Sequence, residues 1–219
     1  MSTSAAKGDA RDRVMPFRAL ACDYDGTLAT QDTIAASMLE ALQRARAAGI
    51  RVVLVTGRSL FELARVCERL DVFDAVVAEN GAVLYFPADS AVRDEGPAPS
   101  LRLLWALDRR HVPFRGGRVI VATTHDHRDA VLGALAEAEV ALKLVENRGA
   151  LMLLPAGISK GTGLKIALFG LGVSAADVLA IGDAENDFDL LDACGWSACP
   201  ENARGGAPRG RRAKRAHRL

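Results

Sequence analysis

The four cysteines of this 219-residue chain form no C-x-x-C pair, which leaves no dithiol or zinc-ribbon motif. Cys22 and Cys67 lie inside apolar runs, so we expect them to be small core residues in a reducing compartment. No apolar run is long enough to cross a bilayer, so we expect no membrane partner. The polar first residues include no apolar signal region. Together these absences favour a cytoplasmic protein.

An excess of charge of one sign is also missing, because 28 Lys and Arg face 27 Asp and Glu. This balance gives no overall reason to expect a nucleic-acid partner. The one basic stretch is at 204–219, inside a tail at 200–219 that we expect to be disordered, like residues 1–15. The basic tail fits an arm for nucleic acid or an acidic partner, an inert tail, or a shifted reading frame. We favour the last, because Arg, Gly, Ala and Pro dominate shifted GC-rich codons.

Apolar runs that alternate with helical patterns predict an α/β fold. Strands that alternate with helices form a doubly wound parallel sheet with helices on both faces. Ser59 is a plausible N-cap for one of the helices. We expect strands at 18–22, 51–56, 75–78 and 178–181. We expect helices at 33–48, 163–169 and 188–193, and one more helix that begins near Ser59.

A second module interrupts this pattern. Asn80-Gly81 is a tight-turn signal, and the strand expected at 82–86 would form a hairpin with the one before it. A loop is expected at 87–100, followed by a small α+β insert. We therefore expect a core domain at 16–85 and 155–199 and an insert at 86–154. The insert would hold helices at 101–110 and 128–140 and strands at 118–123, 141–145 and 150–154.

Carboxylates follow two of the expected strands. Asp23 and Asp25 come directly after the first strand, and Asp183 and Asp187 come after a late one. Ligands bind at the carboxyl ends of the strands in such sheets, so we expect these carboxylates to gather at one edge. A hard divalent cation would neutralise the cluster, and Mg²⁺ fits because it prefers oxygen ligands. Taken singly, each stretch also fits an ordinary Asp-rich turn or helix cap.

Two further elements fit a phosphate site. Thr56-Gly57-Arg58 ends the second strand, where the Thr56 hydroxyl and nearby backbone N–H groups could hold a phosphate. Lys160 lies at the return from the insert to the core, in a chain with few lysines. The alternatives are ordinary turn chemistry for Thr56 and a solvated surface side chain for Lys160.

As a set, these residues resemble the haloacid dehalogenase (HAD) superfamily of phosphohydrolases. The resemblance is to subfamily IIB, with its Cof-type sugar phosphatases, sucrose-phosphate phosphatase and archaeal phosphoglycolate phosphatase. It covers roughly residues 17–193. The matching motifs, in order, are DYDGT at 23–27, Thr56-Gly57-Arg58, Glu79-Asn80-Gly81-Ala82, Lys160, and GDAEND at 182–187.

The resemblance implies a magnesium-dependent phosphatase that acts on small phosphate monoesters. Asp23 would attack phosphorus and form an aspartyl-phosphate, a covalent step that splits one hard displacement into two. Asp25 would protonate the leaving oxygen and then activate water. Thr56 would bond the phosphoryl group, and Lys160 would stabilise its charge. Sugar phosphates or phosphoglycolate are the expected substrates.

The resemblance also implies the binding residues. Mg²⁺ would lie between Asp183, the Asp23 carboxylate and the Asp25 backbone carbonyl, with Asp187 in support. The insert would be a cap that closes over the site and excludes water. Substrate contacts are expected from Gly57, Arg58 and Asn186.

Three alternatives stay open. His125, Asp126 and His127 invite a metal-site interpretation, but we prefer a helix-start cluster on a solvated turn. The whole chain could be a catalytically impaired phosphate-binding or regulatory protein with a truncated or frame-shifted C-terminus. It could also be a phospho-accepting receiver domain, although that class lacks the insert and the late acidic segment. The sequence does not indicate an oligomeric state.

Overall fold

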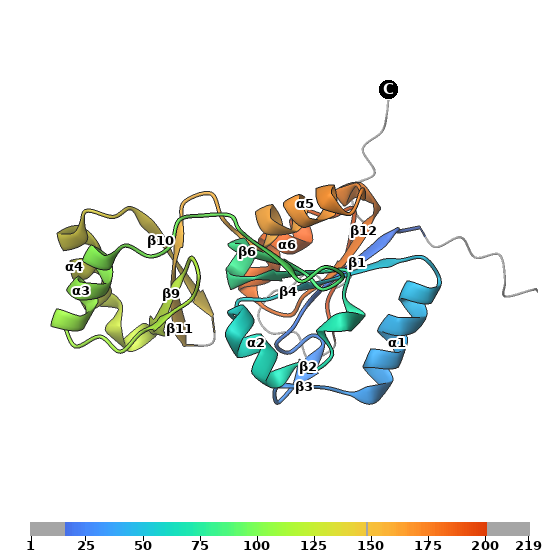
Figure 1. Ribbon diagram of the computed structural model, residues 1–219, viewed down its shortest axis with the longest axis horizontal. Coiled ribbons are helices and arrows are strands. Elements are labelled where there is room, and N and C mark those ends of the chain that lie inside the picture. The colour runs from blue at the N-terminus through green and yellow to red at the C-terminus, as the bar shows by residue number, and fades with distance from the viewer. Residues whose placement is uncertain (1–15, 148, 201–219) are drawn as a thin grey trace, which may run out of the picture.

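The computed structural model describes residues 16–147 and 149–200, which form a large and a smaller lobe (Figure 1). The terminal segments considered above at 1–15 and 201–219 lie outside the described residues. Within the described part, no helix is both long and apolar enough to span a membrane.

The large lobe is built on a seven-stranded sheet of order β13-β12-β1-β4-β5-β6-β7. The strands from β13 to β5 run parallel to their neighbours, whereas β6 and β7 are antiparallel additions at one edge. This arrangement confirms the predicted α/β fold with a mostly parallel sheet. The strands are β1 (Ala19–Asp23), β4 (Arg51–Val55), β5 (Ala75–Ala78), β6 (Val83–Phe86), β7 (Ala91–Asp94), β12 (Val178–Ile181) and β13 (Trp196–Ala198).

Both faces of the parallel sheet are buried, which explains the continuous apolar runs of its strands. In β4, Leu54 joins a core cluster with helices α1 and α2, while Val53 joins another with α5 and α6. Figure 1 shows these two pairs of helices on opposite sides of the sheet. The helices are α1 (Ala36–Ala47), α2 (Leu60–Val66), α5 (Lys160–Gly170) and α6 (Phe188–Asp192).

Several short elements connect these layers. A small hairpin follows β1. Short 3₁₀ turns join several of the described helices and strands, most of them in the large lobe and one in the smaller lobe. The helix expected at 33–48 therefore begins later than predicted. The short elements are β2 (Ala29–Thr30), β3 (Thr33–Ile34), η1 (Leu70–Val72), η2 (Glu79–Gly81), η3 (His125–His127), η4 (Ala175–Asp177) and η5 (Glu185–Asp187).

The smaller lobe is a four-stranded antiparallel sheet of order β10-β11-β9-β8, with two helices on one face. Along β11, Leu151 and Leu153 pack on these helices, while Met152 and Leu154 face the core cluster of the large lobe. The predicted α+β insert is therefore a separate sheet that packs on the core. Its elements are α3 (Leu101–Arg109), β8 (Arg115–Gly116), β9 (Val121–Thr124), α4 (Arg128–Ala138), β10 (Leu142–Asn147) and β11 (Ala150–Pro155).

The loop expected at 87–100 is wrong in part, because it contains β7, which pairs with β6. All four residues of β7 are exposed, so the strand has no apolar alternation that a sequence could display. Its turn includes Ser90 at a φ of 57°, and the Asp89 carboxylate accepts the Ala91 N–H at 3.1 Å. The proposed limit of the insert at residue 86 stays a prediction.

The region after Cys194 also differs from expectation. The last strand predicted from the sequence was the one at 178–181, but β13 pairs in parallel with β12 and forms one edge of the large sheet. The strand has only three residues, all partly buried, which is too short for a periodic signal. The large sheet therefore extends one strand beyond β12.

A buried glutamate joins the two lobes. Glu79, in the turn after β5, is 0% exposed. Its carboxylate accepts hydrogen bonds from backbone N–H groups of the insert, in the segment that leads into β9. The donors are Arg118 and Val119 at 2.9 Å and Ile120 at 3.1 Å. A Cβ at Gly117 would lie 2.5 Å from the Glu79 carboxylate, so glycine is needed for this close approach.

We expect Glu79→Gln to destabilise the protein by about 1–3 kcal/mol in chemical denaturation. The amide has a single acceptor oxygen, and its NH₂ group would face backbone donors in a buried site. Glu68→Gln, on an exposed position, is the control and should change stability by less than about 0.5 kcal/mol. Equal effects of the two substitutions would show that the Glu79 contacts contribute nothing.

Candidate active site

One buried ammonium group connects two buried carboxylates. Lys160 Nζ lies 2.6 Å from Asp23 Oδ1 and 2.6 Å from Asp187 Oδ1. The Lys160 side chain is 2% exposed, and those of Asp23 and Asp187 are 6% and 0% exposed. The prediction that Asp23 and Lys160 share one site is thus matched by the geometry, and Lys160 is not a surface lysine.

Three separate chain segments deliver these groups to one edge of the sheet. Asp23 is the last residue of β1, and Lys160 is the first of α5. Asp187 ends the η5 turn that follows β12, and its Oδ2 accepts the backbone N–H groups of Asp183 and Ala184, each at 3.1 Å. A Cβ at Gly182 would lie 2.6 Å from Asp187 Cβ, so the turn can fold this tightly only around glycine.

The start of α5 is fixed by local capping and by close backbone contact. Ser59 begins α2 with a capping box, as expected, and Ser159 begins α5 in the same way. Gly81 has a φ of +100°, and a Cβ there would lie 1.9 Å from the Ser159 carbonyl oxygen. The turn after β5 therefore packs directly on the residue before Lys160.

The donor set suits a hard divalent cation. Asp23, Asp183 and Asp187 are buried, and each offers a carboxylate oxygen within 4.8 Å of the others. Three carboxylates so close together repel one another, and a cation bound between them would offset that repulsion. Oxygen ligands of this kind fit Mg²⁺. Thr27, which the sequence did not single out, donates its hydroxyl to Asp183 Oδ1 at 3.4 Å.

Burial raises the pKa of Asp23 to about 7, although the Lys160 ammonium lowers it. The folded protein thus holds this proton more tightly than the unfolded chain. The resulting stabilisation is complete below about pH 4 and is lost as the pH rises through about 7. Burial lowers the pKa of Lys160, but the carboxylates of Asp23 and Asp187 hold that pKa above its usual value. A bound cation would stabilise the ionised site at neutral pH.

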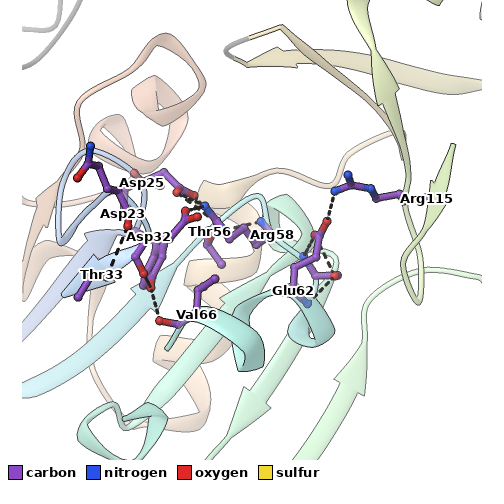
Figure 2. A network of polar contacts seen from close by, with 12 residues as sticks. Asp23, Asp25, Asp32, Thr33, Thr56, Arg58, Glu62, Val66 and Arg115 are labelled. Carbon is purple, nitrogen blue, oxygen red and sulfur yellow. Dashed lines mark hydrogen bonds and ion pairs between the residues drawn. The ribbon is translucent and has the colours of Figure 1, made fainter. Parts of the chain in front are cut away.

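The Asp25 side chain belongs to a second polar cluster, in which Arg58 contacts both Asp25 and Asp32. Arg58 donates from Nε to Asp25 Oδ2 at 2.9 Å and from Nη2 to Oδ1 at 2.6 Å. It also pairs with Asp32, and its guanidinium lies 5.5 Å from the centre of the Tyr24 ring (Figure 2). The Asp25 side chain is therefore not among the clustered metal ligands, and the role expected for its backbone carbonyl stays a prediction.

No motif in the sequence indicated a role for Asp32. It has a φ of 64° in the turn between β2 and β3, and its backbone carbonyl accepts the Tyr24 hydroxyl at 2.9 Å. Only the folded hairpin brings Asp32 to Arg58.

Thr56 and Gly57 lie where the second motif was expected, after β4. Thr56 is 0% exposed, and its hydroxyl accepts the Arg58 N–H at 3.1 Å. A Cβ at Gly57 would lie 3.3 Å from the Asn80 amide. Gly57 and Arg58 line the cavity described next, as a substrate-binding role requires.

A cavity of about 710 Å³ lies between the two lobes. Asp23, Asp25 and Lys160 line its core side, and the insert supplies the opposite wall. The sequence predicted that the insert covers the site but not which of its residues line the cavity, because they meet the site only through tertiary packing. The wall includes Pro113, Phe114, Arg115, Ala122, Thr123, Thr124, His125, Asp126, Asn147, Gly149, Ala150 and Met152.

Asn186 borders a different, smaller cavity of about 370 Å³, which it shares with Lys160. Its amide nitrogen and oxygen are buried and have no hydrogen-bond partner within the described residues. An orphaned amide beside Lys160 is compatible with the expected substrate contact, which stays a prediction.

The His125–Asp126–His127 stretch forms the η3 turn directly before α4, so the helix-start interpretation is confirmed. His125 Nδ1 lies 3.1 Å from Glu146 Oε2. In the part of the chain that the structure describes, the three residues belong to no metal-binding group.

We expect Lys160→Met to cost about 3–5 kcal/mol of stability at neutral pH, measured by denaturant unfolding without divalent metal. The substitution removes the ammonium that bridges the buried carboxylates of Asp23 and Asp187. Lys165→Met, on an exposed position of the same helix, is the matched control and should be nearly neutral. A loss no larger than that of the control would contradict the proposed role of the ammonium.

The sequence comparisons agree with this geometry. A family model described as haloacid dehalogenase-like hydrolase matches residues 20–99 and 117–207, which extends beyond the end at 193 that we expected. The chain is 32% identical over 195 residues to a phosphoglycolate phosphatase of Methanothermobacter thermautotrophicus, covering 85% of this chain and 86% of that protein. It is 31% identical over 193 residues to one of Archaeoglobus fulgidus, covering 85% and 84%.

Solved structures share the fold. A haloacid dehalogenase-like hydrolase from Bacteroides thetaiotaomicron has a TM-score of 0.72 at 19% identity, covering 86% of this chain and 90% of that one. A structure described as a HAD subclass IIB sugar phosphatase has a TM-score of 0.68 at 18% identity, covering 85% and 88%.

Proposed function

This chain belongs to the haloacid dehalogenase-like hydrolase family and is a phosphatase of that family, and we propose that it hydrolyses small phosphate monoesters through a phosphoryl group carried on Asp23. One observation carries the proposal. Lys160 bridges Asp23 and Asp187 at 2.6 Å each, on the core side of the cavity between the lobes. A buried carboxylate held this way is oriented for attack on a substrate atom above it.

In the first step, an Asp23 oxygen bonds to phosphorus as the ester P–O bond breaks, and Asp25 gives its proton to the leaving oxygen. In the second step, Asp25 takes a proton from water, and the water oxygen displaces Asp23 from phosphorus. Lys160 stabilises the added negative charge. Arg58 contacts both oxygens of the Asp25 carboxylate in the structure, so one of these contacts must open before Asp25 can carry the proton. The Thr56 hydroxyl, directly after the neighbouring strand β4, would bond a phosphoryl oxygen.

Asp23, Asp183 and Asp187 are the residues that would hold Mg²⁺. When bound, the ion would supply positive charge to the phosphoryl oxygens and to the carboxylates. The role of Asp187 is double, because the same side chain also anchors Lys160 and the turn that presents Asp183.

We propose phosphoglycolate and similar small esters as the substrate class. The support is the similarity, at 31–32% identity over about 85% of the chain, to relatives named phosphoglycolate phosphatase. A sugar phosphate is the second candidate, since the fold resembles a structure named as a sugar phosphatase. The family match and the inserted lobe argue against a receiver domain.

The purified protein should release phosphate from phosphoglycolate and from an aryl phosphate when Mg²⁺ is present, and Asp23→Asn should abolish both activities. The amide is a poor nucleophile and a weaker metal ligand. Asp71→Asn, an exposed aspartate paired with Arg69, is the control and should keep wild-type activity.

Activity that survives Asp23→Asn, or that survives chelation of the metal, would overturn this mechanism. A folded wild-type protein that is stabilised by Mg²⁺ yet hydrolyses no ester would instead support the catalytically impaired alternative.

A further inference from the structure

The insert places one arginine in the wall of the active-site cavity. Arg115, at the start of β8, lines the cavity opposite Asp23 and Lys160. We propose that Arg115 determines specificity by binding a carboxylate on the non-phosphoryl end of the substrate, and that Glu62 holds Arg115 until substrate arrives. This inference rests on the function proposed above, because it assumes that the phosphoryl end occupies the Asp23 side.

The other cationic side chains that line the cavity already have partners. Among the Arg and Lys side chains that line the cavity in the described residues, Lys160 is buried between two carboxylates. Arg58 is fixed by two hydrogen bonds to Asp25 and by its pair with Asp32. Arg115 makes a single contact, from Nη1 to Glu62 Oε1 at 3.2 Å, and its side chain is 84% exposed. It is therefore the cation of this set that a ligand can recruit most easily.

Exchange of Glu62 for a ligand carboxylate costs little. Exposed ion pairs such as Arg115–Glu62 contribute little to stability, about 0–1 kcal/mol. Glu62 keeps its other partners after release, since Oε2 accepts the Ser59 N–H and hydroxyl at 3.0 Å each. Figure 2 shows Arg115 reaching from the insert to Glu62, while Arg58 points the other way, to Asp25.

The chemistry of arginine favours a carboxylate over a neutral group. The guanidinium plane can form two parallel hydrogen bonds to a carboxylate, and these strengthen where water is excluded. Glu62 already occupies part of the Arg115 guanidinium, so a carboxylate that binds Arg115 through two hydrogen bonds would replace the Glu62 contact. His125, which also lines the cavity, is less available than Arg115 to a substrate carboxylate, because its Nδ1 faces Glu146.

The test compares two esters of similar size, phosphoglycolate and 2-hydroxyethyl phosphate, which differ in the carboxylate. The measured quantity is the ratio of their kcat/KM values. We expect the wild type to prefer phosphoglycolate and Arg115→Met to lower the ratio by about 10- to 100-fold, the range for a hydrogen bond to a charged group. Arg102→Met is the control, since Arg102 lies on α3 in a similarly exposed pair with Glu139, and it should leave the ratio unchanged.

A second variant distinguishes substrate recognition by Arg115 from a purely structural role, a latch in which the Arg115–Glu62 ion pair only holds the two lobes together. Glu62→Gln removes the charge that competes for Arg115 but keeps a residue that completes the capping box with Ser59. We expect it to lower KM for phosphoglycolate, by up to about 5-fold, which is the reverse of the effect of Arg115→Met.

Equal losses for both esters in Arg115→Met, or the same loss in Glu62→Gln as in Arg115→Met, would overturn the inference in favour of a latch. A wild type that hydrolyses both esters equally well would also overturn it, while leaving the phosphatase function intact. A wild type inactive on both esters and on an aryl phosphate would overturn the proposed function itself.

Discussion

The structure depends on the burial of three carboxylates around one ammonium. Lys160 holds Asp23 and Asp187 at 2.6 Å, and Asp183 lies in the same group. Such a cluster carries more negative charge than its lysine offsets, so it is costly to fold and ready to take up a cation. The excess charge that makes the site unfavourable in isolation is also what makes it suited to a metal ion and a phosphoryl group.

The fold maintains this cluster by rigid backbone contacts rather than by long side chains. Glycines at 81 and 182 allow the turns after β5 and β12 to approach the segments that carry Lys160 and Asp187. The Glu79 carboxylate then links the turn after β5 to the insert, because it accepts hydrogen bonds from three backbone N–H groups. The residues that position Lys160 and Asp187 are thus continuous with those that position the cavity wall, so the insert and the carboxylate cluster are parts of one packed unit.

Much of the fold and part of the site could be predicted from the sequence. Strands with both faces buried, such as β4, have continuous apolar runs, and carboxylates at the ends of parallel strands must meet at one edge. The exposed strand β7 has no such pattern and was missed. The partners of single side chains were also missed: neither the Asp25–Arg58–Asp32 cluster nor the Glu62–Arg115 pair follows from spacing, because each joins elements that meet only after folding.

The most direct test of this account is the position of a bound divalent ion. A crystal of the protein grown with Mn²⁺, which shares the oxygen-ligand preference of Mg²⁺, would locate the ion by anomalous scattering. The account predicts one strong peak bonded to the carboxylates of Asp23 and Asp183, with Lys160 still beside Asp23. A fully ordered site without a peak, or a peak away from these carboxylates, would contradict it.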